Sequence, residues 1–164
     1  MGFHNVDHAP ALLPVLPGAP TVLIVDDVDV VLRSMARILT EEGYRAYETS
    51  SAAEAVEVLT TSKRPIDLAI IDVVMPEVNG IAFSHLLRQR WPRTRTLFMS
   101  AHGAEVLAQE GLRDLNAPFL AKPFTRPELL QKLHETLGPH RPRPSGSGTP
   151  DRSPDRQPPR AEHE

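Results

Sequence analysis

Cysteine is absent from this 164-residue chain, which excludes a disulfide framework and any cysteine metal site. No apolar run reaches the roughly 18–20 residues that a membrane-spanning helix needs. The N-terminal stretch has no basic leader and is interrupted by proline, so it makes a poor signal peptide. A formal net charge of −3 gives no reason to expect a nucleic-acid surface. These absences predict a cytoplasmic protein that contacts neither nucleic acid nor membrane.

Proline is plentiful but unevenly spread, and its distribution predicts the domain organisation. Of 17 prolines, four lie in residues 1–20 and seven in residues 139–164. We expect 1–20 to be a flexible proline-rich arm. We expect 139–164 to be disordered, because it has almost no apolar side chains to offset the entropy of ordering. A proline-rich ligand for a partner domain is the alternative for this tail. Residues 21–138 are then one domain, with no attached DNA-binding or enzymatic output expected.

Five short segments that are mostly apolar and end at polar residues predict β-strands. A continuous apolar run with β-branched members is typical of a parallel strand buried on both faces. The second segment alternates with polar residues, which predicts an edge strand. The segments are Thr21–Asp27, Tyr44–Glu48, Leu68–Asp72, Thr96–Ser100 and Phe119–Lys122.

Helical periodicity fills the intervals between these strands. We expect helices over 28–42, 51–59, 81–91, 103–115 and 125–137, the fourth being weakened by Gly103 and Gly111. Thr125 and Glu128 have the spacing of a capping box. The predicted core side chains are Val31, Met35, Ile38, Leu39, Ala52, Ala55, Val56, Leu59, Ile81, Phe83, Leu86, Leu87, Leu129, Leu130, Leu133 and Leu137. Alternating strands and helices predict a parallel α/β sheet with right-handed crossovers and helices on both faces.

The chemically active side chains all fall where a predicted strand ends. Asp26 and Asp27 follow the first strand, Asp72 closes the third, Ser100 the fourth and Lys122 the fifth. Parallel strands place their carboxyl ends along one edge of the sheet, where open α/β sheets bind ligands. The pattern therefore predicts one polar site rather than five separate features. The alternatives are structural: Asp72 closing a strand or bonding loop amides, and Asp27 capping a helix.

Several carboxylates at one sheet edge require a counter-charge. Two of them about 4 Å apart repel by roughly 4 kcal/mol at an effective dielectric near 20. An all-oxygen cluster suits Mg²⁺, which takes one or two carboxylates and completes its shell with water and phosphate oxygens. Lys122 and Ser100 add the ammonium and hydroxyl that a phosphoryl group in transfer needs. Asp72 would then be the nucleophile that forms an aspartyl phosphate.

These motifs resemble the CheY-like receiver domain of two-component response regulators. The resemblance spans about Thr21 to Leu137 and rests on VDD, IIDVVMP with a later NG, a hydroxyl after the fourth strand, and KPF. The combination is much more specific than any one part. It implies a flavodoxin-like doubly wound sheet with strand order 2-1-3-4-5 and helices on both faces.

The resemblance also implies a role for each matching residue. Asp72 would accept phosphate from a histidine on a kinase or phosphotransfer partner, without the chain being an enzyme that turns over other substrates. Mg²⁺ would bind Asp27, Asp72 and the backbone carbonyl of Val74 directly, and Asp26 through water. Ser100 and Lys122 would hold the phosphoryl oxygens. A switch would couple Ser100 to Phe119, and the Lys122–Pro123 peptide bond would be cis. The output would be contact with a protein target, by a monomer or a phosphorylation-dependent dimer.

Two other functions fit parts of the sequence. A receiver fold that no longer takes phosphate would act only as a protein-binding module, although every side chain that phosphorylation needs is present. A haloacid-dehalogenase-type phosphatase also forms an aspartyl phosphate and would use Asp27 and Asp29. Two features of the sequence count against this phosphatase: no acidic pair follows Lys122, and Asp72 would have no role in it.

Overall fold

The computed structural model describes residues 18–76, 78–102 and 118–138. The predicted helix over 103–115 lies outside these residues, as do the predicted tail and all but the last residues of the predicted arm. The described chain forms five strands and four helices, which alternate except that β5 follows β4 in the described order. They are β1 (Thr21–Val25), α1 (Asp29–Glu41), β2 (Arg45–Thr49), α2 (Ala52–Thr61), β3 (Leu68–Asp72), α3 (Gly80–Arg90), β4 (Arg95–Ser100), β5 (Phe119–Ala121) and α5 (Arg126–Leu137).

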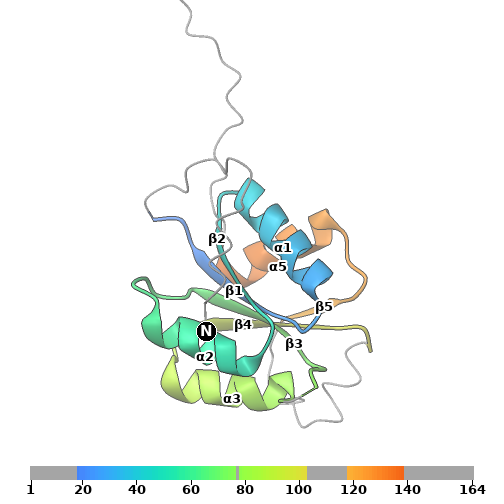
Figure 1. The fold of residues 1–164 in the computed structure, drawn as a ribbon. Coiled ribbons are helices and arrows are strands. Elements are labelled where there is room, and N and C mark those ends of the chain that lie inside the picture. Colours follow the sequence, from blue (N-terminus) through green and yellow to red (C-terminus); the bar gives the residue numbers. More distant parts are fainter. Residues whose placement is uncertain (1–17, 77, 103–117, 139–164) are drawn as a thin grey trace, which may run out of the picture.

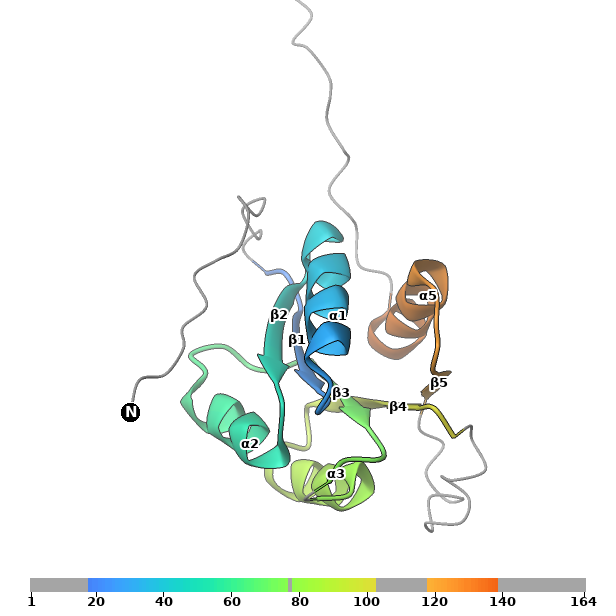
Figure 2. The same ribbon diagram turned by 45° about the vertical axis from the view of Figure 1, so that its right-hand side comes forward.

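All five strands run parallel in one sheet with the order β2-β1-β3-β4-β5, which confirms the predicted topology. β3 lies in the centre, where Ile70 pairs with Ile24 of β1 and with Leu97 of β4. Helices α1 and α5 cover one face of the sheet, and α2 and α3 cover the other (Figures 1 and 2). β2 is an edge strand, as its polar alternation predicts.

The strand side chains divide between two cores because successive residues point to opposite faces. Val22, Ile24, Leu68 and Ile70 pack with α1 and α5. Their neighbours Leu23, Val25, Ala69 and Ile71 pack with α2 and α3. The two cores hold β1 and β3 rigidly, so the residues at their carboxyl ends are held in fixed positions. Within the described residues, no helix is long and apolar enough to cross a membrane.

The element boundaries differ from the sequence predictions by one or two residues. β2 begins at Arg45 instead of Tyr44, because Tyr44 turns into the first core and is 1% exposed. α2 continues to Thr61, and Ser51 is its N-cap, accepting a hydrogen bond from the amide of Glu54. In α5, Glu128 accepts hydrogen bonds from the amide and hydroxyl of Thr125, as the capping-box spacing predicts.

The predicted core was wrong at Leu86, which is 36% exposed. The buried face of α3 runs through Gly80, Phe83, Ser84 and Leu87, a spacing of three and four residues, and Leu86 lies off that face. Elsewhere the helix cores were only partly predicted. Leu32 and Ala36 are buried although the prediction did not include them, whereas Val31, Ile38, Leu130 and Leu137 are only half-buried at the edge of the first core.

Candidate functional site

Asp26 follows β1 directly and is completely buried. Its Oδ1 accepts a hydrogen bond from the amide of Val28 at 2.8 Å, which closes the turn between β1 and α1. Its own amide donates to the carbonyl of Thr49, extending the β1–β2 ladder by one residue. An aspartate that bonds the amide two residues ahead stabilises a turn locally. The carboxylate of Asp26 is therefore fixed by the sheet behind it and by the turn in front.

Asp72 ends β3 with the same arrangement. Its Oδ1 accepts a hydrogen bond from the amide of Val74 at 3.0 Å. The residue is 6% exposed, so its carboxylate reaches the surface only through a narrow opening. Bonding a loop amide was the structural alternative for Asp72, and the structure shows that one oxygen does this. The second oxygen faces the neighbouring strand ends.

Lys122 joins the two buried aspartates. Its Nζ lies 2.5 Å from Oδ2 of Asp26 and 2.7 Å from Oδ2 of Asp72. The backbone amide of Lys122 donates to the carbonyl of Ser100, which anchors the end of β5 against β4. The peptide bond to Pro123 is cis, in agreement with the expectation. Each aspartate thus uses one oxygen for its own turn and the other for the same ammonium.

Asp27 completes an acidic cluster with Asp26 and Asp72. One oxygen from each of the three carboxylates lies within 4.8 Å of the other two. Asp27 is exposed and borders an open cleft of about 280 Å³, together with Met75 and Pro76. The cluster therefore has two buried members held by Lys122 and one member open to solvent.

The charges in this cluster are only partly balanced. Burial raises the pKa of Asp26 above its ordinary 3.8, although the hydrogen bonds from Lys122 and from the amide of Val28 lower it. Burial lowers the pKa of Lys122, but its hydrogen bonds to Asp26 and Asp72 outweigh burial and raise that pKa above 10.5. One ammonium faces three carboxylates, so the site favours a further cation.

The donor set fits Mg²⁺. Three carboxylates within a few ångströms supply the hard oxygen ligands that this ion prefers, and the exposure of Asp27 leaves room for water or a phosphate oxygen. Asp29, which the phosphatase alternative would use, lies apart from the cluster. It begins α1 on the surface and forms a 3.8 Å ion pair with Arg33.

Of the other predicted site residues, Ser100 and Val74 lie next to this cluster, and Phe119 begins β5. Ser100 is fully buried at the end of β4, next to Met99, which pairs with Asp72, and its Oγ accepts a hydrogen bond from the amide of His102. Phe119 is half-buried against the second core. Val74 has an apolar side chain that is 51% exposed at the mouth of the site.

Gly80 contributes to the site through close packing, which the sequence analysis did not predict. A Cβ at this position would overlap the backbone carbonyl oxygen of Asp72. The amide of Gly80 also donates to the carbonyl of Val73 at 3.1 Å. Asn79 caps α3 by accepting a hydrogen bond from the amide of Ile81. The Asn-Gly pair was visible in the sequence as a turn, but its contact with the backbone of Asp72 depends on how α3 packs.

This geometry defines the class of protein. The strand order reverses between β1 and β3, the point where doubly wound α/β proteins bind their ligands, and the acidic cluster lies at that point. The model of the response regulator receiver domain family matches residues 22–134, and the chain belongs to this family. It is thus a receiver domain of two-component signalling.

Individual relatives agree with this assignment. The sensor kinase CckA of Brucella abortus is 34% identical over 122 residues, which are 74% of this chain but 13% of that kinase. The chemotaxis protein CheY of Treponema pallidum is 30% identical over 73% of this chain and 85% of its own length. The structure of CheY4 from Vibrio cholerae superimposes with a TM-score of 0.66 at 26% identity, covering 73% of this chain and 99% of that one.

Proposed function

We propose that this receiver domain, residues 21–138, accepts a phosphoryl group on Asp72 from a histidine of a kinase or phosphotransfer protein. The observation that carries the proposal is the placement of Asp72. Its carboxylate lies at the carboxyl end of the central strand, bonded to Lys122 and within reach of Asp26 and Asp27. Receiver domains are phosphoacceptor modules in signalling and interact with such histidine proteins.

The proposed step is a single displacement at phosphorus. A carboxylate oxygen of Asp72 attacks the phosphorus of a phosphohistidine, and an O–P bond forms as the P–N bond breaks. The electron pair of that bond stays on the imidazole nitrogen, which then takes a proton. The donor would approach from the side of Asp27, the exposed member of the cluster, which borders an open cleft with Met75 and Pro76.

Each remaining residue has a part in this step. Lys122 already bonds one oxygen of Asp72 and would transfer this contact to a phosphoryl oxygen, with Ser100 holding another. Asp27, Asp72 and the carbonyl of Val74 would hold Mg²⁺, with Asp26 acting through water. The ion would supply positive charge to the phosphoryl oxygens. Movement of Ser100 toward the phosphoryl group would release Phe119 to turn inward, which changes the surface offered to a protein target.

The test is phosphorylation by a small donor. The protein is incubated with Mg²⁺ and acetyl phosphate, and its intact mass is measured. We expect one phosphate adduct that disappears in Asp72→Asn and when EDTA removes the metal. Asp29→Asn is the matched control, because it removes a nearby aspartate outside the cluster, and it should be phosphorylated normally. An adduct that persists in Asp72→Asn would contradict the proposal. No adduct at all would favour the binding-module alternative, and sustained hydrolysis of phosphate esters would favour the phosphatase.

A further inference from the structure

Most lysines and arginines of the described residues belong to one of two groups. Those in the first group form ion pairs with carboxylates: Arg33, Arg37, Lys122, Arg126 and Lys132. Those in the second group have no carboxylate within ion-pair distance in the part of the chain that the structure describes, and they line two neighbouring clefts: Arg45, Lys63, Arg64, Arg90 and Arg93. Most of the unpaired lysines and arginines among the described residues are therefore gathered in one region of a chain whose net charge is negative, the exceptions being Arg88 and Arg95.

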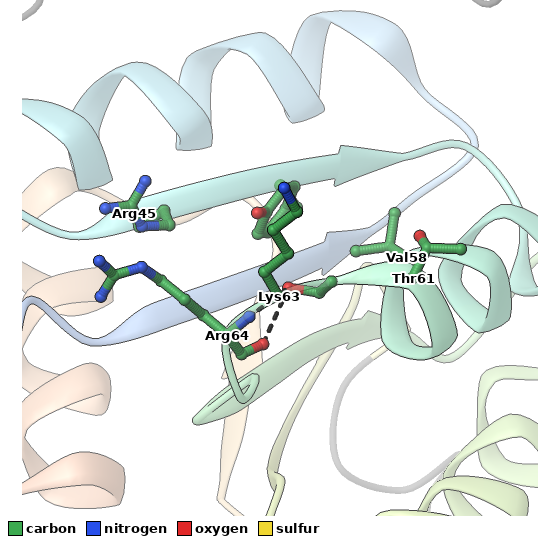
Figure 3. A pocket seen from close by; sticks show the side chains of 7 residues that line it. Arg45, Val58, Thr61, Lys63 and Arg64 are labelled. Carbon is green, nitrogen blue, oxygen red and sulfur yellow. Dashed lines mark hydrogen bonds between the residues drawn. The ribbon is translucent and has the colours of Figure 1, made fainter.

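The first cleft lies between β2 and the end of α2 (Figure 3) and has a volume of about 390 Å³. The guanidinium groups of Arg45 and Arg64 lie next to each other on one side of it, and Val58 and Thr61 of α2 lie on the other (Figure 3). The Nε of Arg45 is buried and has no hydrogen-bond acceptor among the described residues. A buried donor without a partner costs free energy, which a bound acceptor would recover.

The second cleft, also about 390 Å³, lies on the other side of the turn between α2 and β3. Lys63 and Arg64 line both clefts, so the two clefts adjoin at this turn. Its remaining walls are partly apolar: Ile66 is buried, and Trp91 is half-buried at the end of α3. No aspartate or glutamate lines either cleft.

This basic surface lies at the opposite edge of the sheet from Asp72. Arg45 is the first residue of β2 and pairs with Thr21, the first residue of β1, whereas Asp26 and Asp72 stand at the carboxyl ends of their strands. The basic surface is thus separate from the phosphoacceptor site and is not explained by it.

We propose that the two clefts form a docking surface for an acidic segment of a partner protein. Carboxylates of that segment would bind the cations, and its apolar side chains would contact Trp91 and Ile66. Charge complementarity carries the proposal, because five cations with no acidic neighbour in the clefts repel one another until an anionic partner neutralises them.

Two other occupants fit less well. Residues 139–164 of the chain itself carry five arginines against four acidic residues, so they offer no complementary charge. Single-stranded nucleic acid usually stacks its bases on several aromatic side chains, whereas the aromatic residues that line the two clefts are Tyr47 and Trp91, one in each cleft. A short acidic peptide needs only the local cations and one or two apolar contacts. The proposal does not depend on phosphate transfer to Asp72.

The test uses a fluorescein-labelled synthetic peptide of glutamate and leucine, with binding to the full chain measured by fluorescence polarisation. We expect saturable binding that weakens as salt is added, because exposed charges are screened. Trp91 is the only tryptophan, so its emission reports occupation of the second cleft directly. The double variant Lys63→Glu, Arg64→Glu should weaken binding by about tenfold or more. Both residues are exposed, so circular dichroism should show an unchanged fold.

The matched control is the double variant Arg33→Glu, Arg37→Glu, which reverses two charges on α1, on the other face of the sheet. It should bind the peptide within about twofold of the unaltered protein. Asp72→Asn should also bind normally, which separates this proposal from the proposed function. Failure of the acidic peptide to bind at low salt would overturn the proposal. Binding of the peptide by the double variant Lys63→Glu, Arg64→Glu with the affinity of the unaltered protein would also overturn it. Tighter binding of an oligothymidylate of equal length would overturn the peptide assignment.

Discussion

At the scale of single residues, the site depends on how each carboxylate oxygen is used. In both Asp26 and Asp72, one carboxylate oxygen accepts a hydrogen bond from the amide two residues ahead, and the other accepts one from Lys122. This leaves the acidic cluster rigid but short of positive charge. Two consequences for stability follow, and they have opposite signs.

The first prediction concerns Asp26→Asn. Burial places the folded pKa of Asp26 above its unfolded value near 3.8. The folded protein therefore binds more protons in that interval, and its stability falls as the pH rises through it. We expect Asp26→Asn to raise the free energy of unfolding at pH 7, because it removes the cost of burying a charged carboxylate. It should also flatten the decline of stability above pH 4. Urea unfolding from pH 4 to pH 8 measures both effects.

Asp27→Asn is the control for this prediction, because Asp27 belongs to the same cluster but is exposed. It should raise the free energy of unfolding at pH 7 less than Asp26→Asn does, because an exposed carboxylate loses less hydration on folding. If Asp26→Asn destabilises the protein at every pH, the hydrogen bonds of Asp26 outweigh its burial and the prediction is wrong.

The second prediction concerns Lys122→Met, which removes the one ammonium among the described residues that bonds the two buried carboxylates. Leaving such charges uncompensated costs about 3–5 kcal/mol. We expect a loss in the lower part of that range at pH 7, because the site is open on the side of Asp27. The loss should shrink as the pH is lowered and the carboxylates take up protons. Adding Asp26→Asn to this variant should recover part of the stability, and a purely additive double variant would argue against direct coupling of the two residues.

At the scale of elements, the approach of α3 to the end of β3 positions the phosphoacceptor. The helix backbone at Gly80 lies so close to the carbonyl of Asp72 that no side chain fits at position 80. Asn79 starts the helix at this point, and Phe83 and Leu87 seal it against the second core.

Gly80→Ala should therefore lower the free energy of unfolding by about 2 kcal/mol or more, because overpacking a rigid contact costs roughly 1–3 kcal/mol. It should also slow phosphorylation of Asp72 by acetyl phosphate. Gly138→Ala is the control: its added methyl meets open space, and only the positive φ of 84° opposes it. If Gly80→Ala and Gly138→Ala lose equal stability, the steric overlap at position 80 adds no free-energy cost and the prediction is wrong. Thermal melts monitored by circular dichroism measure the difference.

At the scale of the whole molecule, the carboxyl ends and the amino ends of the strands form two chemically different sides of the sheet. The carboxyl edge carries the acidic cluster and Lys122, and the amino edge carries the basic surface around Lys63 and Arg64. The two cores between them hold the strands rigidly, so ligands at either edge should stabilise the same folded unit.

If Mg²⁺ binds the folded acidic cluster as proposed, it should raise the stability of the entire domain, because the unfolded chain has no preformed site for the ion. At a concentration one hundred times the dissociation constant, the gain is about 2.7 kcal/mol. We expect Mg²⁺ to raise the melting temperature of the unaltered protein, and Asp27→Asn to abolish most of that rise. Asp29→Asn, outside the cluster, should keep it. A rise of equal size in all three proteins would mean that the ion does not bind through Asp27.

The sequence predicted the order of elements and the residues at the strand ends, because buried parallel strands are continuous apolar runs that stop at a polar residue. It was wrong at Leu86 because apolar character alone does not fix which face of α3 meets the sheet. It also did not predict that Lys122 bonds Asp26 directly, since these residues are 96 positions apart and meet only through the strand order. The close approach of Gly80 to Asp72 was missed because it depends on how α3 packs against the end of β3.

The sequence by itself determined the parallel α/β architecture, the family motifs and the list of acidic, hydroxyl and ammonium groups at one sheet edge. These follow from local patterns: apolar runs, helical periodicity and turn residues. The tertiary structure alone decided which oxygen of each aspartate bonds Lys122, which aspartate stays exposed, and where the unpaired cations gather. Those features depend on distances between residues far apart in the chain, and such distances are fixed only when the helices pack on both faces of the sheet.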